Sequence, residues 1–258
     1  MAAWVRAALV AAALWLPVAA GASCRQALLL ALDVSGSVDA REYRLQLDGL
    51  AGALLDPQVV AAFEAMPGAP VRIAVMEWSG EGFQRMIQPW TDVADAAALA
   101  GVASRLRGTA RVAAPLSTAI GAALRRAGTE VRAQAECWRQ VIDVSGDGKS
   151  NTGPLPGAIG APLDGVTVNG LVIGEAVPTA GEGRTPEIGE LVAYYRAYVL
   201  RGEDAFVETA AGFEAFEAAM VRKLLRELQV VAVSDATTGA ATGAGPGPSV
   251  RADLGALR

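Results

Sequence analysis

Hydroxyl and carboxylate side chains gather in three short segments of this chain. Asp33, Ser35 and Ser37 alternate directly after an apolar run, Thr118 precedes a helical pattern, and Asp147 follows a second apolar run. Oxygen donors of this kind suit a hard divalent cation such as Mg²⁺, Mn²⁺ or Ca²⁺, and Mg²⁺ prefers six oxygens at about 2.0–2.1 Å. The sequence therefore predicts a site for one cation, provided that the fold brings the three segments together.

The composition excludes most other chemistry. The 258 residues include no histidine, which removes Ser-His-Asp and Cys-His catalysis and HExxH zinc sites. Two cysteines are too few for a four-thiolate zinc or iron–sulfur site. A formal net charge of −5 argues against a nucleic-acid partner. Because 52% of the residues are apolar, the chain can still bury a sizeable core.

Both ends of the chain are expected to lie outside the folded domain. Residues 1–22 combine one positive charge, an apolar run and a small-residue end, which is typical of a secretory signal peptide. The apolar run is short for a lasting membrane anchor, although an uncleaved anchor is the alternative. Residues 233–258 are rich in Ala, Gly, Thr and Pro, which predicts a disordered tail. We therefore expect an exported domain over residues 23–232, periplasmic or secreted, with no stable membrane anchor after cleavage.

Strand and helix patterns alternate along this domain. A continuous apolar run at 27–32 predicts a strand that is covered on both faces, and the segments at 71–78, 139–145 and 165–173 are expected to form further strands. A short strand is expected at 85–90, bounded by Pro89, and Thr91 or Asp92 is expected to cap the helix that follows. Such alternation predicts a three-layer α/β domain with a largely parallel sheet. Ligands of doubly wound sheets bind beyond the carboxyl ends of the strands, where Asp33 and Asp147 stand.

The two cysteines precede the strands that carry these aspartates. Cys24 lies nine residues before Asp33, and Cys137 lies ten residues before Asp147. If the two strands are parallel neighbours, the cysteines lie at the same end in nearly the same register. An oxidising compartment then permits a disulfide, which on the chain-entropy model stabilises the fold by about 4–5 kcal/mol. Two unrelated buried thiols are the alternative.

The order and separation of the polar segments resemble a known family. The three segments Asp33-x-Ser35-x-Ser37, Thr118-Ala119-Ile120-Gly121 and Asp147-Gly148-x-x-Asn151 resemble the metal-ion-dependent adhesion site of von Willebrand factor type A (vWA) domains. The resemblance covers roughly residues 25–231, and the strings at 32–39, 77–80 and 142–148 are similar to an exported bacterial subgroup of uncharacterised function. It implies a Rossmann-like vWA fold with adjacent first and fourth strands, a mostly parallel central sheet and one short antiparallel edge strand.

The resemblance also implies a role for each site residue. The hydroxyls of Ser35, Ser37 and Thr118 would bind the cation directly, whereas Asp33 and Asp147 would hold bound waters. A carboxylate from a protein partner would complete the coordination of the ion. The expected function is thus an exported, metal-dependent, adhesion-type binding module without catalytic activity, and the loop at 174–186 is expected to supply partner specificity.

Two other functions remain open at this point. A metal-assisted hydrolase would need a general base, and without histidine the candidates are Asp143, Glu77 and Glu175. The second alternative is a vWA scaffold whose metal site is vacant. Asp143 interrupts an apolar strand and is expected to be buried, either orienting a residue near the metal or hydrogen-bonding to a loop as structure; we favour the structural role.

Structural roles are also open for the proposed site itself. Ser37 or Asp39 could cap the following helix, and Ser117 or Thr118 could cap another. Glu77 and Trp78 could shape the ligand surface or simply pack at the end of their strand.

Overall fold

The computed structural model describes residues 24–174 and 187–238. The predicted signal peptide, most of the predicted specificity loop and most of the predicted tail lie outside these ranges. Within them, no helix is long and apolar enough to cross a membrane.

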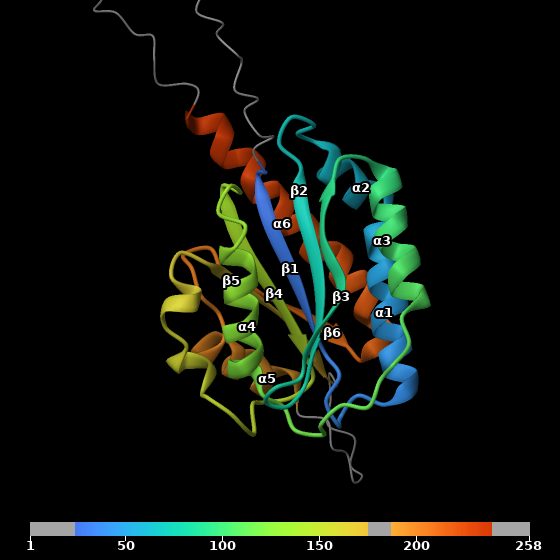
Figure 1. Ribbon diagram of the computed structural model, residues 1–258, viewed down its shortest axis with the longest axis vertical. Coiled ribbons are helices and arrows are strands. Elements are labelled where there is room, and N and C mark those ends of the chain that lie inside the picture. The colour runs from blue at the N-terminus through green and yellow to red at the C-terminus, as the bar shows by residue number, and fades with distance from the viewer. Residues whose placement is uncertain (1–23, 175–186, 239–258) are drawn as a thin grey trace, which may run out of the picture.

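A single six-stranded sheet forms the centre of the described domain (Figure 1). Its strands, in spatial order, are β3 (Gln84–Val93), β2 (Val71–Trp78), β1 (Gln26–Asp33), β4 (Arg139–Gly146), β5 (Thr167–Gly174) and β6 (Val207–Ala211). Every neighbouring pair is parallel except β2 and β3, which are antiparallel. The strand order reverses between β1 and β4, so the carboxyl ends of these two strands border the ligand position expected of a doubly wound sheet.

Helices cover both faces of the sheet, as the continuous apolar strands predict (Figure 1). Leu28, Leu30 and Leu32 of β1 pack in one core, whereas Leu29 and Ala31 pack in the other. The first core is formed with α1 (Ala40–Leu54), α2 (Pro57–Glu64), α3 (Ala96–Gly108) and α6 (Phe216–Thr238), and the second with α4 (Ile120–Arg132) and α5 (Ile188–Tyr198). Three 3₁₀ turns complete the described elements: Pro156–Ala158, Ala161–Leu163 and Phe213–Ala215. The predicted three-layer α/β architecture is confirmed.

The antiparallel edge strand is longer than expected. β3 has ten residues and continues through Pro89 to Val93. A proline is tolerated there because an edge strand leaves one side unpaired, and the pairing with β2 shifts register beside it. The expected helix cap at Thr91 or Asp92 is accordingly wrong, since both residues belong to β3. Asp95 caps α3 instead, and its Oδ1 accepts a hydrogen bond from the backbone N–H of Ala98 at 2.9 Å.

Two features at the ends of the domain bear on the predicted boundaries. α6 continues past position 233, where the tail is predicted to begin, and ends at Thr238. At the other end, Cys24 and Cys137 form the predicted disulfide, with their Cα atoms 4.3 Å apart. Gln26 pairs with Arg139 across the β1–β4 ladder. The two cysteines therefore enter their strands at the same level, which is why they can be bridged.

Candidate metal site

The ends of two parallel strands place the two aspartates of the site. Asp33 is the last residue of β1, and Asp147 directly follows β4, which runs parallel beside it. The side chain of Gln46, on α1, holds this strand end by donating from Nε2 to the backbone carbonyl of Asp33 at 2.9 Å. Gln46 is fully buried, and only its place between Tyr43 and Leu47 on an apolar helix face could have signalled its role.

A chain of hydrogen bonds connects the predicted site residues. Thr118 Oγ1 donates to Ser35 Oγ at 3.2 Å, and the hydroxyls of Ser35 and Ser37 lie 3.3 Å apart. Ser37 Oγ donates to Asp147 Oδ1 at 2.6 Å, and the backbone N–H of Ser35 donates to Asp33 Oδ1 at 2.8 Å. The structure thus brings together all five residues that the sequence singled out.

Thr118, rather than its neighbour Ser117, contributes the third hydroxyl. Asn151 holds the Thr118 backbone twice: its Oδ1 accepts from the Thr118 N–H at 2.9 Å, and its own N–H donates to the Thr118 carbonyl at 2.9 Å. Ser117 Oγ instead lies beside Gly80, where it would be 2.5 Å from a Cβ atom at that position. The Asn151 side chain, already visible in the sequence motif, is therefore what aims Thr118 at Ser35.

The alternative capping roles are resolved by the same geometry. Asp39 caps α1 in a capping box with Glu42, in which each side chain accepts from the other's backbone N–H. Ser37 takes no part in that cap. At α4 the N-cap residue is Ala119, which makes no side-chain cap, so neither Ser117 nor Thr118 caps that helix. The hydroxyls of Ser37 and Thr118 therefore cap neither helix and belong to the hydrogen-bonded cluster.

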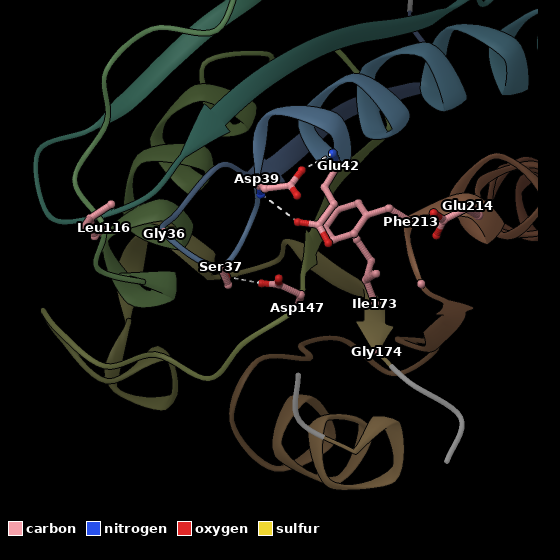
Figure 2. A pocket seen from close by; sticks show the side chains of 11 residues that line it. Gly36, Ser37, Asp39, Glu42, Leu116, Asp147, Ile173, Gly174, Phe213 and Glu214 are labelled. Atoms are coloured by element: carbon pink, nitrogen blue, oxygen red, sulfur yellow. Dashed lines mark hydrogen bonds between the residues drawn. The ribbon is translucent and has the colours of Figure 1, made fainter. Parts of the chain in front are cut away.

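The cluster is buried at one end and open at the other. Asp33 is 0% exposed and Thr118 is 6% exposed, whereas Ser37 is exposed. A cavity of about 590 Å³ adjoins the open end, with Ser37 and Asp147 on one wall and Ile173 and Phe213 across from them (Figure 2). A side chain from another molecule can thus reach Ser37 and Asp147 from solvent.

Carboxyl groups gather in and around the cluster, and burial disfavours the charged forms of Asp33 and Asp147. Burial, and secondarily the nearby charge of Asp147, raises the pKa of Asp33 to about 8, although the hydrogen bonds from Ser35 oppose the shift. Burial also raises the pKa of Asp147, against the hydrogen bond from Ser37. Three further acidic side chains line the cavity, namely Asp39, Glu42 and Glu214. A bound cation would relieve this unfavourable charge.

The donor set fits a hard divalent cation. Asp33 Oδ2 is buried and has no hydrogen-bond partner, which leaves an acceptor available for a cation or its bound water. The three hydroxyls and two carboxylates are the oxygen ligands that Mg²⁺, Mn²⁺ and Ca²⁺ prefer. Within residues 24–174 and 187–238, no three His, Cys, Asp or Glu side chains form a group that could hold a metal, so the candidate site depends on its hydroxyls as well as on its two carboxylates.

Asp143 lies away from this cluster in a buried ion pair. Lys223 Nζ on α6 lies 2.7 Å from Asp143 Oδ1 in an ion pair, and it also donates to Glu227 Oε1 at 3.0 Å. Asn169 on β5 donates to the same Glu227 carboxylate at 2.6 Å. Burial raises the pKa of Asp143 to about 7 even though Lys223 opposes the shift. This supports the structural role, through an ion pair and not the expected hydrogen bond to a loop.

The sequence analysis missed the partner of Asp143. Lys223 lies three residues after Met220, and Glu227 lies four residues after Lys223, so both fall on the buried face of the last helix. Charged residues on an apolar stripe are the signal that could have revealed the pair, because buried charges need partners.

The other general-base candidates offer no support for hydrolysis. Glu77 is 1% exposed and accepts hydrogen bonds from Tyr43 at 2.6 Å and Arg85 at 2.9 Å. Trp78 is fully buried, so neither residue shapes the ligand surface. Glu175 lies outside the described residues.

Comparison with known sequences identifies a family match. Residues 23–232 match the family model described as a protein of unknown function, DUF1194. No curated protein matches the sequence.

Several solved structures share the fold at low sequence identity. Proximal thread matrix protein 1 from the mussel byssus aligns with a TM-score of 0.55 and 17% identity, over 81% of this chain and 49% of that protein. A further structure of that protein, described as having a zinc-occupied MIDAS motif, aligns with a TM-score of 0.55 and 16% identity, over 80% of this chain and 46% of the other. BatB from Bacteroides thetaiotaomicron aligns with a TM-score of 0.51 and 17% identity, over 80% of this chain and 98% of the other.

These likenesses concern the fold. The chain spans about half the length of the mussel protein. Together with the strand order of the sheet, the similarities show the vWA fold that the sequence motifs imply.

Proposed function

Since this chain belongs to the DUF1194 family of proteins of unknown function and folds as a vWA domain, we propose that it is an exported, metal-dependent protein-binding module. One divalent cation is held by Asp33, Ser35, Ser37, Thr118 and Asp147. The hydrogen-bonded cluster of three hydroxyls and two buried carboxylates carries this proposal. The comparison structure with a zinc-occupied MIDAS motif supports a metal in a domain of this fold.

The three neutral hydroxyls bind the cation directly, and the two aspartates act through bound waters. Direct neutral ligands leave most of the positive charge on the ion, so it attracts a further anionic oxygen. The open end at Ser37 and the adjoining cavity give a partner access to that position. Mg²⁺ is the proposed ion, with Mn²⁺ or Ca²⁺ as the alternatives.

The partner is a protein that presents an acidic side chain. Asp39, Glu42 and Glu214 make the surface around the cluster acidic, and the whole chain carries a formal net charge of −5. Without the cation, this surface repels a carboxylate, so binding depends on the metal.

Export fits the cysteine chemistry of the chain. The Cys24–Cys137 disulfide persists in the periplasm or outside the cell, whereas a reducing cytosol would keep both thiols free. We therefore propose that residues 1–22 are a cleaved signal peptide.

Calorimetric titration with Mg²⁺ and Mn²⁺ tests the site. Wild-type protein should bind one ion, and Thr118→Ala should bind much more weakly. Ser117→Ala is the matched control, because it removes the neighbouring hydroxyl that lies outside the cluster and should leave affinity unchanged. Equal weakening by both variants would contradict the assignment.

Capture of partners from the exported protein fraction tests the binding function. Wild-type and Ser117→Ala baits should retain a partner in Mg²⁺ and release it on addition of a chelator, whereas Thr118→Ala should retain none. A partner that stays bound in chelator would refute metal-dependent recognition.

A further inference from the structure

Tyr195 on α5 packs over one glycine of β4 and one glycine of β5, and its hydroxyl reaches the edge of the proposed cation site. Its side chain is fully buried. A Cβ atom at Gly170 on β5 would lie 2.7 Å from Tyr195 Cδ1, and one at Gly146 on β4 would lie 2.8 Å from its hydroxyl oxygen. These distances are shorter than van der Waals contact, so glycine at both positions is what admits the ring and its hydroxyl.

The Tyr195 hydroxyl ends beside the unpartnered oxygen of Asp33. The same Cβ position at Gly146 lies 2.9 Å from Asp33 Oδ2. The two oxygens therefore border one small space beside the Gly146 backbone. Each is buried, and neither has a hydrogen-bond partner.

A hydroxyl placed in this way is costly unless it acquires a partner. Leaving a buried polar group without a hydrogen bond destabilises the fold, and phenylalanine would fill the same space without that cost. The other oxygen of the same carboxylate, Asp33 Oδ1, is already held by the N–H of Ser35 at 2.8 Å. The orientation of the Asp33 carboxylate is thus fixed on one side and open on the side that faces Tyr195.

We propose that Tyr195 is a positioning residue of the cation site, whose hydroxyl donates a hydrogen bond to Asp33 Oδ2 directly or through one trapped water. This inference rests on the proposed function, because the bond forms with the ionised carboxylate that a cation requires. Together, Ser35 and Tyr195 hold both oxygens of Asp33. Partners that orient a metal-binding group in this way commonly change metal affinity by 10-fold or more when they are removed.

The test compares Tyr195→Phe with wild-type protein in two measurements. Titration with Mg²⁺ should show about 10-fold weaker binding by the variant. Thermal unfolding in chelator should show that the metal-free variant is at least as stable as wild type, because the substitution removes an unsatisfied hydroxyl. Tyr198→Phe is the control: it makes the same change on the same helix at a side chain that is 52% exposed, and it should alter neither measurement.

The outcomes separate the two proposals. Wild-type binding of Mg²⁺ together with unchanged affinity in Tyr195→Phe would overturn the role of Tyr195 and leave the site intact. A variant that is destabilised in chelator and binds with wild-type affinity when folded would identify a packing role and likewise overturn the inference. Failure of wild-type protein to bind Mg²⁺ would overturn the proposed function itself.

Discussion

Replacing Asp33 by Asn should separate the stability of the metal-free domain from its ability to bind a cation. Asn is nearly isosteric and keeps an oxygen that can accept from the Ser35 N–H. It replaces a carboxyl group that is 0% exposed and whose pKa burial raises to about 8, so it abolishes the cost of keeping that group protonated at neutral pH. The variant should therefore be more stable than wild type in chelator and yet bind Mg²⁺ much more weakly.

The magnitude follows from the pKa of Asp33. Burial raises this pKa from 3.8 to about 8, so the folded protein at pH 7 must hold a proton that the unfolded chain has lost. That difference costs wild type at most about 4 kcal/mol, and a gain of about 2–4 kcal/mol in Asp33→Asn raises the melting temperature by roughly 4–16 °C.

The pH dependence has a definite sign. Because the folded pKa is raised, the contribution of Asp33 to stability is present below pH 4 and is lost as pH rises towards 8. Wild type in chelator should lose stability through this window, and Asp33→Asn should lose less. Denaturant unfolding at pH 5, 7 and 8.5, in chelator and in Mg²⁺, measures both effects.

Asp39→Asn is the matched control for this experiment. Asp39 is exposed and caps α1, and Asn is an equally good N-cap residue. Its replacement should leave stability and Mg²⁺ affinity close to wild type. A metal-free Asp33→Asn protein that is less stable than wild type, or one that binds Mg²⁺ equally well, would refute the reasoning.

Three further substitutions test the surroundings of the site. Lys223→Met leaves the buried Asp143 without its ion-pair partner, so the free energy of unfolding at pH 8 should fall by about 3–5 kcal/mol. Part of this loss should be recovered at pH 5, because the buried carboxylates become protonated. Denaturant unfolding at both pH values measures this, and a loss that does not depend on pH would count against it. Replacing Cys24 and Cys137 by Ser should cost about 4–5 kcal/mol in denaturant unfolding but leave Mg²⁺ titrations unchanged, because the bond precedes the strands that end at the site. Gly121→Ala places a Cβ atom 2.0 Å from the Pro154 carbonyl oxygen, so it should lower the free energy of unfolding by about 1–3 kcal/mol and weaken Mg²⁺ binding through the loop before α4. Gly101→Ala is the control: it has open space around it and should have neither effect.

Much of the fold could be predicted because its signals are local. The continuous apolar run of β1 requires burial on both faces, which only a sheet between two helical layers provides. The polar residues that follow β1 and β4 then fall at one edge of the sheet. The nearly equal spacing of Cys24 and Cys137 ahead of Asp33 and Asp147 likewise predicted the disulfide that the structure contains.

Other features depend on which surfaces meet, and a linear pattern does not contain that information. Pro89 ends a strand in most settings, but β3 lies at the edge of the sheet and continues through it. The partner of Asp143 comes from α6, eighty residues further along the chain, and packing alone brings Lys223 to it.

The sequence by itself determined the chemistry of the candidate site: oxygen donors only, no histidine, and positions at the ends of two buried strands. The tertiary structure decided how those donors are arranged. It selected Thr118 over Ser117 through Asn151, and it placed the Tyr195 hydroxyl beside Asp33 through two strand glycines. Residue types fix which ligands a site can attract, whereas the contacts between distant segments fix where each donor points.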